Sequence, residues 1–301
     1  MAFQRHGDKR RSLADAVRLV PDGAMVALGG GLCSRLPMAA VRELVRLGRR
    51  DLHIVGSAHS MDVDLLIAAG AVRVCEESYV GYEHDLGLAP AFRAAAEAGT
   101  VEVRESSCAT VLAQLRAAET GLPFMPVMGV RGTDLPALHP EWGTVTCPFT
   151  GQELIAAPPL RPDVALLHAP LGDRYGNLHF DQPYVLDERF AAAAQLVVAT
   201  VDRIASPADV AAAGVTVPAH LVAAVAEVPY GAHPASCYPG YAYDRAHLTE
   251  WVAAAAAGET GVKAYLERYV HPGEDAYRAQ VEPERLTSWS ESPAAWKELF
   301  R

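Results

Sequence analysis

Three consecutive glycines, Gly29, Gly30 and Gly31, stand between a short apolar run and a proline. The run Met25–Leu28 is too short for a helix and is typical of a buried strand in a parallel sheet. Glycine tolerates positive φ and lets a ligand approach the main chain, while Pro37 suits the first turn of a helix. A strand, a glycine loop and a helix N-terminus together can bind an anionic or carbonyl-bearing ligand. The same spacing also fits a tight strand-to-helix connection without a ligand.

A second polar loop, residues 56–60, follows the next expected strand, Leu52–Val55. In parallel α/β sheets ligands bind beyond the carboxyl ends of the strands, so this loop and the glycine loop are expected to face one pocket. Ser57 and Ser60 supply its hydroxyls. Both residues also suit helix capping, which is the alternative role.

A third loop, residues 76–84, is dense in polar and aromatic groups after the strand expected at Val72–Cys75. It contains Ser78, Tyr79, Tyr82 and Glu83. Carboxylates and phenols in such a loop can orient an acyl substrate or supply an acid or a base. A solvated loop is the alternative, although the two tyrosines around residue 81 indicate a partly enclosed segment.

A fourth loop, residues 105–108, follows the strand expected at Val101–Arg104. Glu105, beside a helix N-terminus, has the chemistry of a base or a nucleophile. The alternative is a helix capped by Ser106 or Ser107, with Glu105 complementing the helix dipole. Cys108 is more typical of a small buried apolar residue than of a nucleophile.

Other catalytic patterns do not occur in the sequence. The histidines form no H-E-x-x-H or paired spacing, so no metal site is predicted. There is no G-x-S-x-G elbow and no Walker loop, and the three glycines do not match the G-x-G-x-x-G dinucleotide pattern. The residues by themselves therefore indicate a pocket lined by four strand-end loops, and they do not identify a reaction.

The spacing of the expected elements indicates the fold. Strands recur about every 20 to 30 residues with helices between them, which predicts a doubly wound, mainly parallel α/β sheet with helices on both faces. A further strand is expected at Leu122–Val127. The pattern weakens over residues 130–162, which predicts a long irregular segment with short strands, of a kind that is often functional or interface-forming. A helical tail is expected at 244–301, within a single unit of 1–301.

Composition limits the partners and the compartment. The formal net charge of −10 argues against nucleic acid or an anionic membrane as the main partner, because either requires a positive face. The five cysteines form no C-x-x-C pair, which favours free thiols in a reducing cytosol. The sequence shows no secretory apolar core and no run of membrane-spanning length, so a cytoplasmic location is expected.

Motifs along the chain resemble those of the A (alpha) subunits of family I CoA-transferases, especially glutaconate CoA-transferase-like ones. The N-terminal motif comprises Asp22-Gly23, Val26-Ala27-Leu28, Gly29-Gly30 and Pro37. Two positions depart from it, since Gly31 stands where an aromatic is frequent and Arg35 where many members have glycine. The form Ser34–Met38 instead resembles the glutaconate and steroid-degradation branch. The other matching segments are Glu77–Glu83, Gly121–Pro126, Gly132–Asp134, Pro148–Gly151, Arg161–Ala165, Asp173–Asn177 and Val228–Pro234.

The resemblance implies a two-subunit enzyme that moves CoA between an acyl-CoA and a small dicarboxylic or oxo acid. In such enzymes the glutamate that attacks the thioester belongs to the B (beta) subunit, and its Ser-Glu-Asn-Gly type of motif does not occur here. This chain is therefore expected to shape the acyl-CoA pocket, to bind no cofactor, and to form a heterotetramer with a B subunit, with residues 130–162 as an interface region. The residues expected at the substrate site are Gly29, Gly30, Gly31, Ser34, Arg35, Ser57, Ser78, Tyr79, Tyr82, Glu83 and Ser106.

The resemblance leaves two points open. Arg35 suits a substrate carboxylate or a CoA phosphate, and equally a salt bridge across the subunit interface. A related branch, acting on CoA thioesters from steroid-ring breakdown, hydrolyses a C–C bond with an A-type glutamate at the position of Glu105. Hydrolysis with Glu105 as catalytic base is thus the alternative to transfer. A non-catalytic ligand sensor is a third reading, which the acidic charge and the lack of a helix-turn-helix module disfavour.

Overall fold

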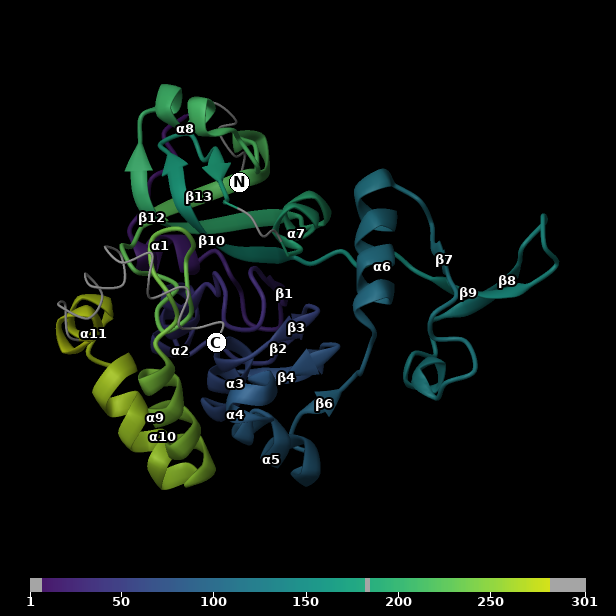
Figure 1. Ribbon diagram of the computed structural model, residues 1–301, viewed down its shortest axis with the longest axis horizontal. Helices are drawn as coiled ribbons and strands as arrows, with labels where there is room; N and C mark the ends of the chain where they lie inside the picture. The colour runs from purple at the N-terminus through teal and green to yellow at the C-terminus, as the bar shows by residue number, and fades with distance from the viewer. Residues whose placement is uncertain (1–6, 182–184, 282–301) are drawn as a thin grey trace.

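A computed structural model describes residues 7–181 and 185–281 (Figure 1). Its centre is an eight-stranded sheet whose main path runs β13-β12-β10-β1-β2-β4-β6, with every neighbouring pair parallel. The eighth strand, β11, pairs antiparallel with β10. The expected mainly parallel α/β sheet is confirmed. The strands are β1 Met25–Leu28, β2 Leu52–Val55, β4 Val72–Glu76, β6 Glu102–Val103, β10 Val164–Asp173, β11 Leu178–His179, β12 Leu196–Ala205 and β13 Val222–Glu227.

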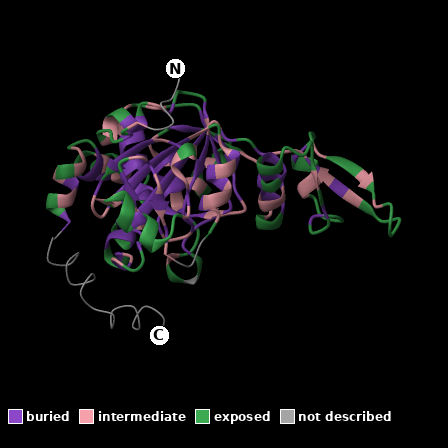
Figure 2. Ribbon diagram, turned by 90° about the horizontal axis from the view of Figure 1, so that it is seen from above, coloured by how far each residue is buried: buried purple, intermediate pink, exposed green. Residues whose placement is uncertain are grey.

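Helices cover both faces of this sheet, as expected for a doubly wound fold. Side chains alternate across a strand, so Val26 and Leu28 of β1 join one hydrophobic cluster and Ala27 joins the other. The larger cluster lies under α1 (Leu13–Val17), α2 (Met38–Arg46) and α3 (Met61–Ala68), and the smaller under α6 (Cys108–Thr120) and α7 (Asp187–Ala193). Figure 2 shows the strands of the central sheet as a buried layer between the helices on its two faces.

Short elements complete the body of the molecule. The strands β3 (Ala58–His59) and β5 (Tyr79–Val80) pair parallel with each other beyond the ends of β2 and β4. The other elements are α4 Glu83–Leu86, α5 Pro90–Ala98, α8 Pro207–Ala213 and η2 Ala219–Leu221. None of the helices within the described ranges is long and apolar enough to cross a bilayer.

Residues 122–157 form an arm that projects beyond α6 (Figure 1). It contains β7 (Met125–Val127), η1 (Leu135–Leu138), β8 (Gly143–Thr146) and β9 (Glu153–Ala157), with β7 and β8 each antiparallel to β9. The strand expected at 122–127 therefore does not belong to the central sheet, and the short strands expected within residues 130–162 are β8 and β9, which form a β-hairpin. Pro126 lacks a backbone N–H, which suits β7 to the edge of a small sheet.

The C-terminal part of the described chain is helical, as expected as far as residue 281. Its elements are α9 (Arg245–Ala256), α10 (Glu259–Tyr265), the π-helical η3 (Leu266–Val270) and α11 (Glu274–Gln280). The rest of the expected tail, 282–301, lies outside the described residues.

A buried ion pair joins α11 to α2. The Arg42 side chain is 1% exposed, and its Nε donates to Glu274 Oε2 at 2.9 Å. Its Nη1 donates to the carbonyl of His233 at 2.9 Å, and its guanidinium lies over the Tyr277 ring. Because both charges are largely removed from water, loss of either side chain would leave the other as a buried charge without its ion-pair partner.

We expect Glu274→Ala to lower the free energy of unfolding by about 3–5 kcal/mol, because it leaves the Arg42 guanidinium buried without its carboxylate. The matched control is Glu97→Ala, which breaks an exposed pair with Arg93 and should cost less than about 0.5 kcal/mol. Urea unfolding followed by circular dichroism measures both. Equal losses in the two variants would show that the buried pair does not hold α11 in place.

Candidate functional site

The loops after β1, β2, β4 and β6 meet at one edge of the sheet, as their parallel order requires. Backbone hydrogen bonds join each loop to the next. These bonds run from Leu32 N–H to Ala58 O (2.8 Å), from Ser78 N–H to Ser57 O (2.9 Å) and from Ser106 N–H to Glu77 O (3.2 Å). The four loops singled out in the sequence therefore form one continuous surface.

The glycine loop requires glycine at two positions for steric reasons. Gly30 has φ +75°, and a Cβ there would lie 2.3 Å from the carbonyl oxygen of Ser34. A Cβ at Gly29 would lie 2.6 Å from the Leu167 side chain and 2.8 Å from Asp187 Oδ1. The packing of the loop thus accounts for these two glycines before any ligand is considered.

Arg35 points inward from this loop. Its side chain is fully buried, and its Nη2 lies 3.0 Å from Asp187 Oδ2. The other carboxylate oxygen of Asp187 accepts the Gly30 N–H at 2.9 Å. From the sequence, Arg35 was expected to bind a substrate carboxylate or a CoA phosphate, or to form a salt bridge across the subunit interface. In the structure it forms an ion pair with Asp187 of the same chain. Asp187 lies 152 residues from Arg35 in the sequence, and no local pattern marked it.

Residues 230–243, which the sequence did not assign to the site, pack on the glycine loop. Arg35 N–H donates to Ser236 O at 2.6 Å, and Ser236 N–H donates to Cys33 O at 2.8 Å. The backbone of Ser34 forms a parallel bridge with the same serine. Ser34 itself is half-buried between the two segments.

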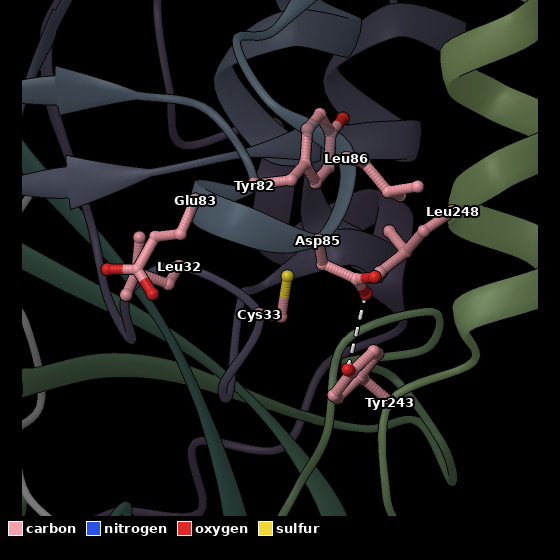
Figure 3. Close-up of a pocket in the computed structure, with 8 residues that line it drawn as sticks. All are labelled: Leu32, Cys33, Tyr82, Glu83, Asp85, Leu86, Tyr243 and Leu248. Carbon is pink, nitrogen blue, oxygen red and sulfur yellow. Dashed lines mark hydrogen bonds between the residues drawn. The ribbon is translucent and has the colours of Figure 1, made fainter. Parts of the chain in front are cut away.

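A cavity of about 230 Å³ opens beside the glycine loop (Figure 3). Tyr82 and Glu83, two of the expected site residues, line it. Glu83 is exposed, and its backbone N–H donates to the hydroxyl of Tyr79 at 3.0 Å. Leu32 and Cys33 of the glycine loop line it too, and the lining residues outside the four expected loops are Asp85, Leu86, Tyr243 and Leu248.

The polar groups of this cavity are largely neutral or paired. Burial raises the pKa of the Cys33 thiol to about 11, so it stays protonated at neutral pH and is a weak nucleophile. Asp85 accepts hydrogen bonds from the Tyr243 hydroxyl at 3.3 Å and from Arg245 Nε at 2.6 Å. The cavity therefore suits a largely apolar part of a ligand.

A buried cluster of charged residues lies under the second and third loops. His59 Nδ1 is 2.9 Å from Glu77 Oε1, and His59 Nε2 is 3.9 Å from Asp62 Oδ2. A Cβ at Gly56 would lie 2.3 Å from Glu77 Oε1, so glycine makes room for the pair. Burial opposes the charge on His59, but the carboxylates of Glu77 and Asp62 outweigh it and raise the pKa of His59 to about 9.

Several buried polar atoms at this edge have no hydrogen-bond partner within the described chain. They include Glu77 Oε2 and the hydroxyl oxygens of Ser78, Tyr82 and Ser106. Buried polar atoms are nearly always paired, so these oxygens are available to a ligand, a water molecule or another chain. Three of the four belong to residues expected at the site from the sequence.

Glu105 is exposed at the end of β6. Its carbonyl accepts a hydrogen bond from Nε2 of His139, at 2.9 Å, and the buried His139 ring stacks on Trp142 at 4.0 Å. The root of the arm thus fixes the backbone that carries Glu105. Next to it, Ser107 caps α6 by accepting the N–H of Thr110 at 3.2 Å, as one alternative expected.

Two minor expectations fail here. Cys108 is exposed at the first turn of α6, although a buried residue was expected, because the α6 face that packs on the sheet begins at Thr110 and Val111. Ser60 does not cap α3 with its side chain, since its hydroxyl donates to Leu32 O in the glycine loop. That hydroxyl links two of the four loops instead.

Comparison with known proteins places the chain in a family. The family model described as coenzyme A transferase matches residues 10–228. The chain is 34% identical to the A subunit of 3-oxoadipate CoA-transferase from Pseudomonas knackmussii, over 88% of this chain and 94% of that protein. It is 32% identical to the cholesterol ring-cleaving hydrolase IpdA subunit of Mycobacterium tuberculosis H37Rv, over 91% and 97% of the two chains.

Structural comparison agrees with these matches. The crystal structure of glutaconate coenzyme A-transferase from Acidaminococcus fermentans aligns with a TM-score of 0.90 at 28% identity, over 95% of this chain and 96% of that chain. A relative from Archaeoglobus fulgidus, 34% identical, is longer, and the chain spans 60% of its length.

The raised pKa of His59 predicts a pH-dependent stability. The pair stabilises the native state fully below the ordinary histidine value of 6.5, and this contribution is lost as pH rises through about 9. We therefore expect His59→Gln to cost about 3 kcal/mol of unfolding free energy at pH 6 and markedly less at pH 9.5. The control is His220→Gln at an exposed position, and urea unfolding at the two pH values measures the difference. A loss for His59→Gln that does not change with pH would contradict the charged pair.

Proposed function

The chain belongs to the coenzyme A transferase family, as its A-type member, and from this we propose that it is one half of a heteromeric CoA-transferase. The enzyme moves CoA between an acyl-CoA and a small dicarboxylic or oxo acid. Relatives named for 3-oxoadipate and glutaconate, both dicarboxylic acids, support this choice of substrate class. Free thiols throughout the described chain and the acidic composition suit a cytoplasmic enzyme.

The observation that carries the proposal is the set of unpartnered buried oxygens at the sheet edge. The hydroxyls of Ser78 and Ser106 lie in loops that are already joined by backbone bonds, so they are held in place without being satisfied. Hydroxyls held in this way can donate to a thioester carbonyl or to the carboxylate of the acid, where charge develops during acyl transfer. The chain thus offers a binding surface for an acyl group.

The nucleophile of this scheme comes from the partner. In the first step a glutamate carboxylate of the B subunit bonds to the thioester carbonyl, which forms an acyl-glutamyl anhydride and releases the CoA thiolate. The thiolate then attacks the glutamyl carbonyl, which releases the first acid and leaves a glutamyl-CoA thioester. The second acid then reacts by these two steps in reverse, so CoA is transferred from the first acyl group to the second with no net hydrolysis.

The arm is the surface that we assign to the B subunit. Apolar side chains exposed on and around it are Leu122, Phe124, Met128, Leu138 and Phe149, and the last is 94% exposed. Its own core is small, with Val127, Val130, Ile155 and Ala157 as the buried members. Exposed apolar surface of this kind on a thin projection is typical of a contact with another chain.

Hydrolysis remains a specific second candidate because of Glu105. Its carboxylate is exposed at the same edge, and the relative named as a ring-cleaving hydrolase shares 32% of its residues. In this alternative Glu105 is the base that activates water. His139, by bonding the Glu105 carbonyl, would position that base once the arm is held by the partner.

One variant, tested for CoA exchange and for hydrolysis, separates the two candidates. We expect the chain alone to be inactive and the chain co-expressed with a B-type partner to exchange radiolabelled CoA between glutaryl-CoA and free 3-oxoadipate or glutaconate. Under transfer, Glu105→Gln changes the exchange rate by less than about threefold, because the nucleophile lies in the partner. Under hydrolysis, the pair exchanges no CoA but hydrolyses a C–C bond of its CoA-thioester substrate, and the same change lowers that hydrolysis rate about 10²-fold or more, as loss of a general base does.

The control variant is Glu97→Gln, on the exposed face of α5, which should match the wild-type pair. Inactivation by borohydride only in the presence of acyl-CoA supports a glutamyl-CoA intermediate. An assembled pair that exchanges no acyl-CoA with any acid tested would contradict the transferase proposal.

The arm gives a separate prediction. We expect Phe149→Asp to weaken assembly with the B subunit by at least about tenfold, because a charge replaces an exposed aromatic in the contact, and to leave the folding of this chain unchanged. Val215→Asp, at an exposed apolar residue far from the arm after α8, is the matched control. Light scattering and calorimetric titration measure assembly. Equal weakening by both variants would contradict the assignment of the arm.

A further inference from the structure

Three residues with metal-binding side chains lie together outside the four loops. They are His168 of β10, Asp202 of β12 and Cys237 of the segment that packs on the glycine loop. One ligand atom of each lies within 4.8 Å of the others. His168 and Cys237 are fully buried, while the Asp202 side chain is 19% exposed and gives the cluster an opening to solvent.

Hydrogen bonds fix the tautomer of His168. The Thr200 hydroxyl donates to Leu167 O at 3.4 Å, so its oxygen is free to accept from His168 Nδ1–H at 2.9 Å. In the neutral ring the lone pair is then on Nε2, which faces the cluster. Histidines that bind metals are held in this way, with the second ring nitrogen donating to a neighbouring oxygen.

No group of the described chain donates a hydrogen bond to the lone pair on His168 Nε2. His168 Nε2 makes no hydrogen bond to any described residue, although it lies 3.3 Å from Asp202 Oδ1. The Tyr241 hydroxyl already donates to the same oxygen at 3.3 Å. A bare ring nitrogen and a carboxylate oxygen at this distance repel unless a cation or a proton lies between them.

We propose that His168 Nε2, the Asp202 carboxylate and Cys237 Sγ bind one divalent transition metal, with Zn²⁺ as the preferred ion. A set of one nitrogen, one sulfur and one oxygen ligand suits Zn²⁺ and does not suit Mg²⁺ or Ca²⁺. On binding, the Cys237 thiol loses its proton to solvent and the thiolate bonds the metal. The two charges of Zn²⁺ are then balanced by the thiolate and the carboxylate, which leaves the buried site neutral.

The placement of Cys237 indicates what the metal does. Ser236, its neighbour in the sequence, bonds the backbone of both Arg35 and Cys33 in the glycine loop. A metal on Cys237 therefore ties this segment to β10 and β12 and stiffens the loop from below. This role is structural and lies outside the acyl-transfer chemistry.

The test uses the full-length chain, freed of metal with a chelator and titrated with Co²⁺ and with Zn²⁺. We expect about one equivalent of Zn²⁺ to remain after dialysis, and Co²⁺ to give a thiolate charge-transfer absorption band that Zn²⁺ abolishes. Thermal unfolding should shift upward with bound Zn²⁺, since only the native state assembles the site. The wild-type titration needs no variant, so the proposal stays testable if a variant fails to fold.

Variants identify the ligands. We expect Cys237→Ser to remove the charge-transfer band, and Thr200→Val to weaken Zn²⁺ binding about 10–100-fold by freeing the His168 ring. Cys147→Ser is the control, because Cys147 lies outside the cluster and its pKa is lowered by hydrogen bonds from Thr150 and Phe149. The His179–Asp181 pair, 3.5 Å apart without a thiol, provides a second control through His179→Gln.

Two results would overturn the proposal. One is retention of less than about a tenth of an equivalent of Zn²⁺ by the wild-type chain, with no Co²⁺ charge-transfer band. The other is binding that survives Cys237→Ser and is lost in Cys147→Ser, which would place the metal on the Cys147 thiol.

Discussion

The glycine loop depends on one buried carboxylate. Asp187 receives the Gly30 N–H with one oxygen and the Arg35 guanidinium with the other, so it satisfies a backbone amide and a full charge that are both out of contact with water. Because both groups are buried, loss of the Asp187 carboxylate would remove a hydrogen-bond acceptor from the Gly30 N–H and an opposite charge from the Arg35 guanidinium. The contact also explains Gly29, because a Cβ there would occupy the space of the carboxylate. The shape of the loop thus follows from a residue on a distant helix.

At the sheet edge, the backbone groups that join the loops are hydrogen-bonded, but several side-chain oxygens are not. Main-chain bonds join the four loops to one another, whereas Ser78, Ser106 and Glu77 each keep a buried oxygen without a partner in the described chain. The arm repeats this contrast, since its strands are paired with one another and its apolar side chains are exposed. At both the sheet edge and the arm, the backbone hydrogen bonds are formed within the chain while polar oxygens or apolar side chains lack contacts. This pattern is consistent with one half of a site shared with another chain.

Two buried histidines show how surroundings decide the role of the same side chain. His59 lies between two carboxylates, which hold its proton against the cost of burial. His168 faces one carboxylate and one thiol, and Thr200 holds its proton on the far nitrogen. The first arrangement favours an imidazolium ion, and the second places the Nε2 atom of His168 3.3 Å from Asp202 Oδ1.

The sequence by itself determined the mainly parallel sheet and the grouping of the four loops, because hydrophobic runs and turns are local and parallel strands must end at one edge. It also indicated Ser78, Tyr82 and Ser106 through their position after strands. Only the tertiary structure decided that Arg35 turns inward, because its partner Asp187 belongs to a helix far along the chain. The same holds for the arm, since a strand's hydrophobic pattern does not reveal which sheet it joins, and for the meeting of His168, Asp202 and Cys237. Contacts between residues distant in the sequence leave no periodic pattern, so they become visible only when the chain is folded.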